Sequence, residues 1–254
     1  MRGVWASFAL AWQFLTIIPL PGSPGAVTTS STFASSLRWF PVVGFLLGAG
    51  LVMVDRVLGD SLAPMALNLV LLTLYVLVTG GLHQDGLADT VDALAGGKTP
   101  EDRLRILRDS HIGALGATGL ILSLGLRYVG QMSLPVGLRE SMILCMPAIG
   151  RWAMVIGAWG GVYPRPEGLA APFIRNMSAL DVLVASTVVW VGLFLLFGPM
   201  AALALLIMGS VVIRLFVWWV SRKMGGVTGD ILGSINEGLE ILFVLAAPAL
   251  LFLG

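Results

Sequence analysis

The sequence predicts an all-α polytopic membrane protein, a bundle of about seven transmembrane helices forming one integral membrane domain over residues 1–254. Three observations predict this class. Hydrophobic residues make up 57% of the chain and charged residues only 11%, whereas soluble domains contain about 45–50% and about 25%. The mean hydropathy is +0.93. The apolar residues also fall into stretches of about 20 residues, the length that a helix needs to cross a bilayer.

Seven stretches have the length and composition of a membrane span. They run from Leu37 to Leu58, Ser61 to Gly81, Ile112 to Met132, Arg139 to Gly160, Leu180 to Phe197, Pro199 to Val220, and Glu237 to Leu253. Gly198-Pro199 divides the long uncharged run between Asp181 and Arg214. Because glycine commonly ends a helix and proline commonly begins one, we expect two helices there.

The first apolar stretch, Val4 to Leu20, precedes these seven and carries Trp5 and Trp12. It could either lie in the membrane interface or span the bilayer. Its basic start is weak and it has no small-residue cleavage site, so we expect it to be retained sequence and not a signal peptide. A linker rich in glycine, proline, serine and threonine follows, from Pro21 to Ser36.

Seven spans would bring three long polar loops, Leu82 to His111, Gly161 to Ala179 and Ser221 to Asn236, to the same side of the membrane. That side carries Arg38, Lys98, Arg103, Arg105, Arg108, Arg165, Arg175, Arg222 and Lys223, and the opposite side only Arg56, Arg127 and Arg139. The excess of positive charge predicts cytoplasmic loops on a multi-pass protein of the cell (inner) membrane. The loops would suit a site for soluble, phosphate-bearing substrates at the membrane boundary.

The charge pattern excludes some classes of function. A formal net charge of +1 without a long basic run argues against a nucleic acid partner. The single cysteine, Cys145, lies in an apolar run, so we expect a buried thiol.

Three aspartates follow the second predicted span, in the stretch G-G-L-H-Q-D-G-L-A-D-T-V-D from Gly80 to Asp92. The i, i+4, i+7 spacing of Asp85, Asp89 and Asp92 predicts one stripe of a helix, with neighbours roughly 6 Å apart. Like charges in such a stripe repel one another, and removal from water raises the cost. We therefore expect a cation among them, with the three aspartates as metal ligands and catalytic residues.

A second acidic cluster follows the sixth span, where Asp230, Ser234 and Glu237 repeat the same spacing. The hydrophobic run after Glu240 is short, which predicts that Glu237 and Glu240 lie near the membrane surface. Asp230 and Glu237 could then join the first stripe around one or two Mg²⁺ ions, which prefer oxygen ligands and are commonly shared with substrate phosphates. The alternative is that these acids merely flank helix N-termini, where the macrodipole favours them.

Four other residues are candidates for substrate binding: Arg108, His111, Arg151 and His83. Arg108 and His111 lie just before the third span, near the aspartate stripe. Arg151 lies within a span, where an arginine commonly faces a polar cavity or a partner, so it could bind a phosphate or pair with a carboxylate. His83 points away from the stripe on a regular helix, as an interfacial side chain or a hydrogen-bond donor behind the site.

The segment Gly96-Gly97-Lys98-Thr99 is similar to part of a nucleotide-binding P-loop but fails its pattern. Asp92 stands where the first glycine is required, and the preceding residues are helical in pattern. Thr99, Pro100 and Asp102 instead predict a helix N-terminus, with a capping residue, a proline at the first helical position and an acid in the first turn.

Five motifs together resemble one family. They are G-G-L-H-Q-D-G-L-A-D-T-V-D-A-L, R-L-R-I-L-R-D-S-H-I-G-A-L-G-A, A-I-G-R-W, Y-P-R-P-E-G-L and G-G-V-T-G-D-I-L-G. This combination resembles the cobalamin synthases, or adenosylcobinamide-GDP ribazoletransferases, from Q-F-L-T-I-I-P-L-P near the N-terminus to the last helix. Gln84 stands where the family commonly has an aliphatic residue, and His111 where arginine is frequent. The second departure weakens the case for phosphate binding by His111.

The resemblance implies a transferase that joins adenosylcobinamide-GDP to α-ribazole or its 5′-phosphate, forming adenosylcobalamin or its phosphate and releasing GMP. Asp85, Asp89 and Asp92 would hold Mg²⁺ against the pyrophosphate, with Asp230 and Glu237 as further acids and Arg108 and Arg151 as phosphate-binding residues. The lipid bilayer is the expected environment. A homo-oligomer, or a complex with other enzymes of cobalamin synthesis, stays open.

Three other functions would use similar acids. A CDP-alcohol phosphatidyltransferase needs an aspartate where Leu82 stands and an arginine where Asp89 stands. A membrane prenyltransferase needs a second D-x-x-x-D pair, but Ser234 follows Asp230 at that spacing. An ion-coupled transporter should place its carboxylates near the bilayer midplane on broken helices.

Overall fold

The computed structural model describes residues 2–20 and 30–251, and these form helices and connecting loops without any strand. In chain order the helices are α1 (Arg2–Leu15), α2 (Ser30–Ser36), the 3-10 helix η1 (Leu37–Trp39), α3 (Phe40–Leu58), α4 (Pro64–Thr79), α5 (Leu82–Gly96), α6 (Pro100–Ile106), α7 (Ala114–Met132), α8 (Val136–Ala158), α9 (Ala171–Arg175), α10 (Ala179–Phe197), α11 (Pro199–Met224) and α12 (Gly229–Leu251). Residues 21–29 of the predicted linker and 252–254 beyond the last helix lie outside the described residues. The all-α prediction is confirmed.

Among the described residues, five helical segments are long and apolar enough to cross a membrane: α3 together with η1 and most of α2, and then α8, α10, α11 and α12. The pair α4 and α5 meets the same criterion only when taken together, which raises the number to six at most. The prediction of a polytopic helical bundle is confirmed, with five or six candidate spans where about seven were predicted. The helix α7 forms where a span was predicted, but it carries the buried polar side chains Ser123, Arg127 and Gln131.

The predicted span Ser61 to Gly81 is shorter in the structure and ends in a sharp bend. Its helix, α4, has 16 residues, and the axes of α4 and α5 differ by 87°. Gly80 and Gly81 form the bend with φ angles of 64° and 69°, in the left-handed region that glycine adopts without steric cost. The bend places Asp85 in the first turn of a new helix.

The last predicted span also begins elsewhere, because α12 starts at Gly229 and not at Glu237. Glu237 and Glu240 consequently lie inside the helix with no solvent exposure, which corrects the prediction that they lie near the membrane surface. Arg127 and Arg151 supply the opposite charges that a buried carboxylate requires. The last helix therefore includes these two glutamates and is longer than the apolar run that follows them.

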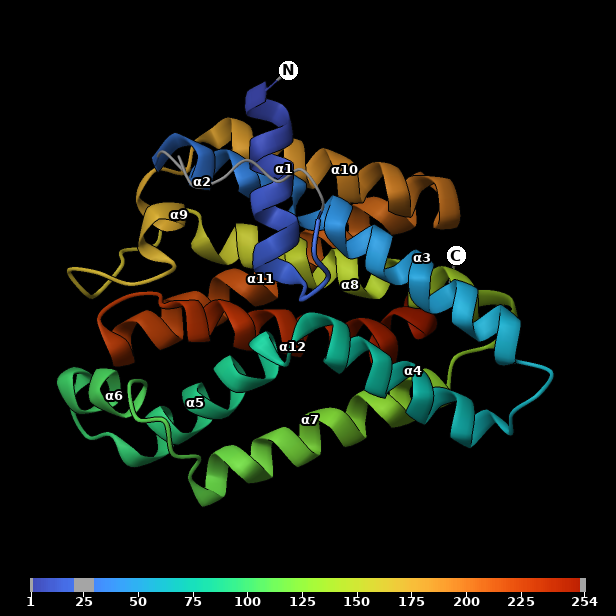
Figure 1. The fold of residues 1–254 in the computed structure, drawn as a ribbon, viewed down its shortest axis with the longest axis horizontal. Helices are drawn as coiled ribbons and strands as arrows, with labels where there is room; N and C mark the ends of the chain where they lie inside the picture. Colours follow the sequence, from blue (N-terminus) through green and yellow to red (C-terminus); the bar gives the residue numbers. More distant parts are fainter. Residues whose placement is uncertain (1, 21–29, 252–254) are drawn as a thin grey trace.

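The helices α8 and α12 form the centre of the bundle (Figure 1). The helix α8 packs against α3, α10 and α12, and nearly all of its residues from Met142 to Ala158 are buried. The helix α12 in turn packs against α5 and α7. Cys145 lies within this centre with no exposed surface, as predicted.

The N-terminal helix α1 lies across the direction of the neighbouring helices (Figure 1). Its 14 residues extend about 21 Å at 1.5 Å per residue, which is less than the about 30 Å of a bilayer core. The chain after it is held to the bend by a hydrogen bond from the Ile17 amide to the Val78 carbonyl, at 2.8 Å. The helix is therefore too short to span the membrane alone, and it borders the region where α4 meets α5.

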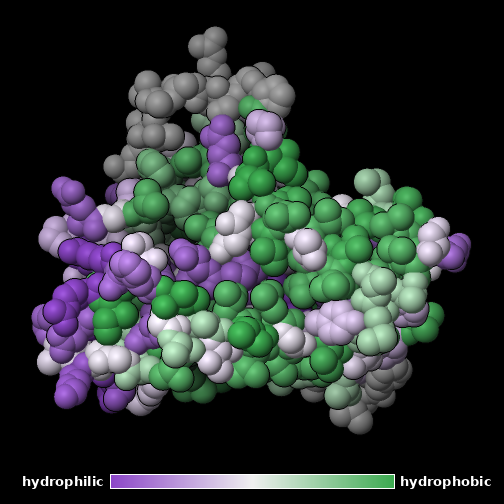
Figure 2. Space-filling model, turned by 60° about the horizontal axis from the view of Figure 1, so that its bottom comes forward, coloured by the Kyte–Doolittle hydropathy of each residue, from purple (hydrophilic) through white to green (hydrophobic). Residues whose placement is uncertain are grey.

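The molecule has a polar end. Figure 2 shows hydrophilic side chains gathered at the left, where Figure 1 places α6, while hydrophobic side chains cover most of the remaining face. The helix α6 begins as predicted, because the Thr99 hydroxyl accepts a hydrogen bond from the Asp102 amide at 3.1 Å. The predicted break between two helices at Gly198 is also confirmed, with α11 beginning at Pro199.

Candidate active site

The three predicted aspartates do lie on one continuous helix, α5. Asp85 is exposed, while Asp89 and Asp92 are partly buried. In the described part of the chain, no hydrogen bond to the Asp85 or Asp89 carboxylate is present. These two carboxylates are therefore available to a ligand or an ion.

Asp92 has a different environment from the other two. Its carboxylate accepts hydrogen bonds from the backbone amides of Gly113 and Gly116, both at 2.7 Å. These amides belong to the N-terminus of α7, where the helix dipole also favours a negative charge. Asp92 thus joins α5 to the start of α7, a role that the i, i+7 spacing does not reveal.

Asp230 comes close to the stripe because α5 and α12 approach each other closely. A Cβ atom on Gly86 would lie only 2.9 Å from the Asp230 carbonyl oxygen. The Ser234 hydroxyl donates a hydrogen bond to the Gly86 carbonyl at 3.1 Å. The expectation that the two acidic segments converge is therefore met for Asp230.

The clustered aspartates affect one another electrostatically. Taken without α4, the helix α5 is not among the candidate membrane spans. Partial burial and, after it, the negative charges of Asp85, Asp230 and Asp92 together raise the pKa of Asp89 to about 6. A cation bound among these carboxylates would relieve that repulsion.

The carboxylates are not already arranged as a metal site. Within residues 2–20 and 30–251, no group of three acidic, histidine or cysteine side chains is close enough to hold an ion. The donor chemistry nevertheless fits Mg²⁺, which binds carboxylate oxygens, keeps several water ligands and needs only one or two protein carboxylates when phosphates complete its shell. Metal binding by these residues stays a prediction.

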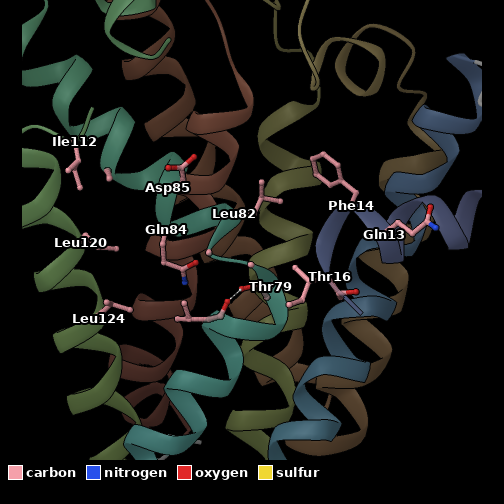
Figure 3. Close-up of a pocket in the computed structure, with 15 residues that line it drawn as sticks. Gln13, Phe14, Thr16, Thr79, Leu82, Gln84, Asp85, Ile112, Leu120 and Leu124 are labelled. Atoms are coloured by element: carbon pink, nitrogen blue, oxygen red, sulfur yellow. Dashed lines mark hydrogen bonds between the residues drawn. The ribbon is translucent and has the colours of Figure 1, made fainter. Parts of the chain in front are cut away.

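Two cavities meet at Asp85 and share Phe14 and Leu82 as lining residues. The larger one, of about 630 Å³, lies between α1, α7 and the bend before α5. Figure 3 shows it, with Leu120 and Leu124 on one side, Phe14 and Thr16 on the other, and Gln84 and Asp85 between them. The smaller one, of about 320 Å³, is lined by His83 and Asp230 and by several aromatic side chains.

Arg165 lines the smaller cavity. It was not among the site residues predicted from the sequence. It lies in the loop between α8 and α9 and donates a hydrogen bond to the Leu104 carbonyl at 3.2 Å, which joins this loop to α6. It lines the same cavity as Asp230. The available signal is the arginine between two prolines in Y-P-R-P-E-G-L, one of the motifs behind the family resemblance.

His83 lines the smaller cavity and is only 2% exposed. Its Nε2 atom has no hydrogen-bond partner. The helical spacing predicts that His83 points away from Asp85, whereas in the structure both residues line one cavity. Substrate binding by His83 stays a prediction, now with a cavity to support it.

Arg151 and Glu237 are not part of this site. Arg151 is fully buried and pairs with Glu240 at 2.5 Å, so the alternative of pairing with a carboxylate is the correct one. Glu237 is also fully buried and pairs with Arg127 at 2.7 Å. Each charge therefore has an opposite partner within the protein, which favours a structural role for both residues.

These four charged residues form one buried network with Tyr75. Arg127 also pairs with Glu240, at 2.9 Å. The Tyr75 hydroxyl donates a hydrogen bond to Glu240 at 2.6 Å and also contacts Arg151. Both guanidinium groups lie 5.2 Å from the centre of the Tyr75 ring. Arg127, counted from the sequence on the side opposite the long loops, therefore lies in the buried part of α7 and leaves the count of charges on that side.

The side chain of Gln84 connects the network to the candidate site. The Gln84 amide donates a hydrogen bond to Glu237 at 3.2 Å, and Gln84 lines the larger cavity beside Asp85. The glutamine at this position, an unusual residue by the family resemblance, thus links the two polar regions.

Arg108 and His111 both lie exposed in the loop between α6 and α7. His111 forms a hydrogen bond with Asp109, with its Nδ1 atom 2.6 Å from the carboxylate. Neither residue lines the two cavities that meet at Asp85. Their assignment to substrate binding stays a prediction without geometric support.

Comparison with known proteins gives a consistent result. The family model described as cobalamin-5-phosphate synthase matches residues 7–248. The chain is similar to proteins named adenosylcobinamide-GDP ribazoletransferase from Syntrophobacter fumaroxidans, 33% identical over 97% of this chain and 100% of that protein, and Desulfitobacterium hafniense, 36% identical over 99% and 98%. A protein of the same name from Chlorobaculum tepidum is 38% identical over 93% of each chain. No solved structure matches.

Proposed function

The chain belongs to the cobalamin-5-phosphate synthase family, and from this premise we propose that it is a membrane transferase with adenosylcobinamide-GDP as donor and α-ribazole, or its 5′-phosphate, as acceptor. The acceptor hydroxyl oxygen bonds to the phosphorus next to the cobinamide. The bond from that phosphorus to GMP breaks, so that GMP leaves with its own phosphate. The product is adenosylcobalamin or its 5′-phosphate.

The main support from the structure is the excess of negative charge where the two cavities meet. Asp85 lines both cavities and Asp230 lines the smaller one, while Asp89 lies one turn further along α5. A diphosphate would be repelled by these carboxylates in the absence of a divalent ion. The arrangement therefore supports a site that takes up a metal ion and a diphosphate together.

We assign the Mg²⁺ ligands to Asp85, Asp89 and Asp230, with Asp92 holding α5 against α7. A bound Mg²⁺ ion would neutralise the charge that develops on the departing GMP. An aspartate that is not needed for the ion accepts the proton of the acceptor hydroxyl. Arg165 binds a phosphate oxygen through its guanidinium group.

We also propose an inner-membrane location with the site on the cytoplasmic side. After Arg127 is removed from the count, the predicted long-loop side still carries most of the arginine and lysine residues of the loops. Figure 2 supports a polar end at α6, near the start of α12 that carries Asp230. A soluble nucleotide donor would reach that end from water.

The test is a GMP-release assay with the detergent-solubilised protein, adenosylcobinamide-GDP and α-ribazole. We expect GMP in the presence of Mg²⁺, none in EDTA, and recovery when excess Mg²⁺ is restored. A metal-independent reaction would contradict the Mg²⁺ assignment but leave the transferase intact. Failure to release GMP from an inserted, folded protein would contradict the proposed function.

Product analysis also separates the alternatives. A CDP-alcohol phosphatidyltransferase would release CMP, and a prenyltransferase would release pyrophosphate. The bend between α4 and α5 is a broken helix of the kind that transporters use, so solute uptake by vesicles containing the protein is the matching test for transport. Family membership favours the transferase.

A further inference from the structure

The smaller cavity has the size of a nucleoside site. Its volume is about 320 Å³, half that of the larger cavity at about 630 Å³. A corrinoid macrocycle with its amide side chains is far larger than the smaller cavity. A flat two-ring base with its ribose is of the right order for a pocket of this size.

The cavity walls carry a cluster of aromatic side chains. Phe14, Phe40 and Phe173 all line it. The centre of the Phe173 ring lies 4.9 Å from that of Phe14 and 6.0 Å from that of Phe40. Met154 lines the same cavity. Aromatic rings and methionine sulfur both make favourable contacts with a flat aromatic ring.

The cavity lining also includes polar side chains, one of which has a buried atom without a hydrogen-bond partner. The Nε2 atom of His83, a residue only 2% exposed, has no partner in the structure. A buried polar atom without a hydrogen bond is destabilising, so it commonly marks the place of a water molecule or ligand. Asp85 and Asp230 complete this polar lining, together with Arg165, whose Nε atom is also buried and unpartnered.

We propose that the smaller cavity binds the nucleoside acceptor, with the aromatic base among Phe40, Phe173 and Met154 and the ribose toward His83, Asp85 and Asp230. This inference rests on the proposed function. It places the ribose hydroxyl next to the carboxylates that take its proton, and the 5′-phosphate, where present, within reach of Arg165. The larger, more open cavity is left for the corrinoid part of the donor.

The sharing of Asp85 supports this division. Group transfer between two substrates requires both to reach the same reacting atoms, and Asp85 lines both cavities. The larger cavity lacks the phenylalanine cluster: of the three rings, only Phe14 lines it. Its other walls are mainly aliphatic, which suits a large and partly apolar macrocycle (Figure 3).

The first experiment compares two variants that each add a ring to one cavity. Met154→Phe narrows the smaller cavity, and Leu124→Phe narrows the larger one. We expect Met154→Phe to raise KM for α-ribazole about tenfold, with KM for adenosylcobinamide-GDP changed less than twofold. We also expect it to shift preference toward an α-riboside that carries a single phenyl ring. Leu124→Phe should affect KM for the donor and leave acceptor preference unchanged.

The reverse pattern, or equal changes in both KM values, would overturn the assignment. Because Met154 is buried and its variant could fail to fold, a second measurement uses the wild-type protein. The α-riboside of 5-azidobenzimidazole is photolysed in the solubilised enzyme and the labelled peptides are identified. Label on the segments around Phe40, Met154 or Phe173 supports the proposal, and label confined to α7 overturns it. If the wild type releases GMP but the label lies on α7, the proposed function stands and this inference alone fails.

Discussion

Two polar regions of this molecule use the same kinds of side chain for different purposes. The first is the acidic site of Asp85, Asp89 and Asp230, where α5 meets α12. The second is the buried network of Arg127, Arg151, Glu237, Glu240 and Tyr75. The network contains two cations and two anions, none with any solvent exposure. The acidic site contains an excess of carboxylates and is open to two cavities.

The comparison shows that charge balance separates a structural cluster from a ligand site. A buried carboxylate paired with an arginine has its charge compensated by the protein itself, and it needs no further partner. Neighbouring carboxylates without such partners repel one another, and their charges add to the larger effect of partial burial in raising the pKa of Asp89. The acidic site therefore requires a cation from outside the protein to compensate its charge.

Removing one carboxylate from the acidic site should give the largest effect. We expect Asp89→Asn to lower the rate of GMP release by about 10³-fold, because metal-ion stabilisation of developing charge is worth several kcal/mol. The thermal midpoint in detergent should stay at or above the wild-type value, since the change relieves repulsion. Asp60→Asn, at an exposed position between α3 and α4, is the charge-matched control. Activity near wild type for Asp89→Asn would remove this residue from the metal site.

Breaking the buried network should instead reduce stability. Glu240→Leu leaves Arg151 without its carboxylate, and we expect a loss of about 3–5 kcal/mol in the free energy of unfolding. The double variant Glu240→Leu, Arg151→Leu should recover much of this loss, because Arg127 and Glu237 then remain as a balanced pair. Denaturant titration in detergent measures both. A single variant as stable as the wild type would mean that the network is not a compensated structural cluster.

The close approach of α5 and α12 offers a smaller and more local test. Gly86→Ala would place a Cβ atom 2.9 Å from the Asp230 carbonyl, so we expect a loss of about 1–3 kcal/mol in stability together with reduced turnover. Gly50→Ala is the matched control, because a Cβ atom there meets nothing within 4 Å. It should be neutral or slightly stabilising, since alanine favours a helix. Equal effects of the two substitutions would argue against a tightly packed crossing beneath the site.

The smallest effect is expected at the polar end, outside both regions. Thr99→Ala removes the hydroxyl that accepts a hydrogen bond from the Asp102 amide. We expect local destabilisation of α6 by about 1 kcal/mol. Thr99→Ser should retain the cap. Hydrogen exchange of the first-turn amides of α6 is the measurement, with faster exchange expected only in the alanine variant. Unchanged exchange in Thr99→Ala would show that this cap contributes nothing to the helix.

The family and the helical class followed from the sequence, as did several local features. The cap at Thr99, the helix break at Gly198 and the shared helix of Asp85, Asp89 and Asp92 are all local in the chain. Such features depend on neighbouring residues, so sequence spacing predicts them directly. The smaller number of candidate spans and the wrong start of the last helix arose where polar residues interrupt apolar runs, at Arg127 and Glu237.

By itself, the sequence determined that this chain forms membrane helices and carries a stripe of acids on one of them, because composition and periodicity are properties of the chain. Only the tertiary structure decided which charges are compensated. Arg151 and Glu237 have the residue types of a phosphate ligand and a metal ligand, yet helices distant in sequence bring each of them an opposite charge. Arg165 and His83 come to one cavity with Asp85 by the same packing. Whether a charged side chain serves a ligand or the fold depends on its neighbours in space, and these are set by how the helices pack.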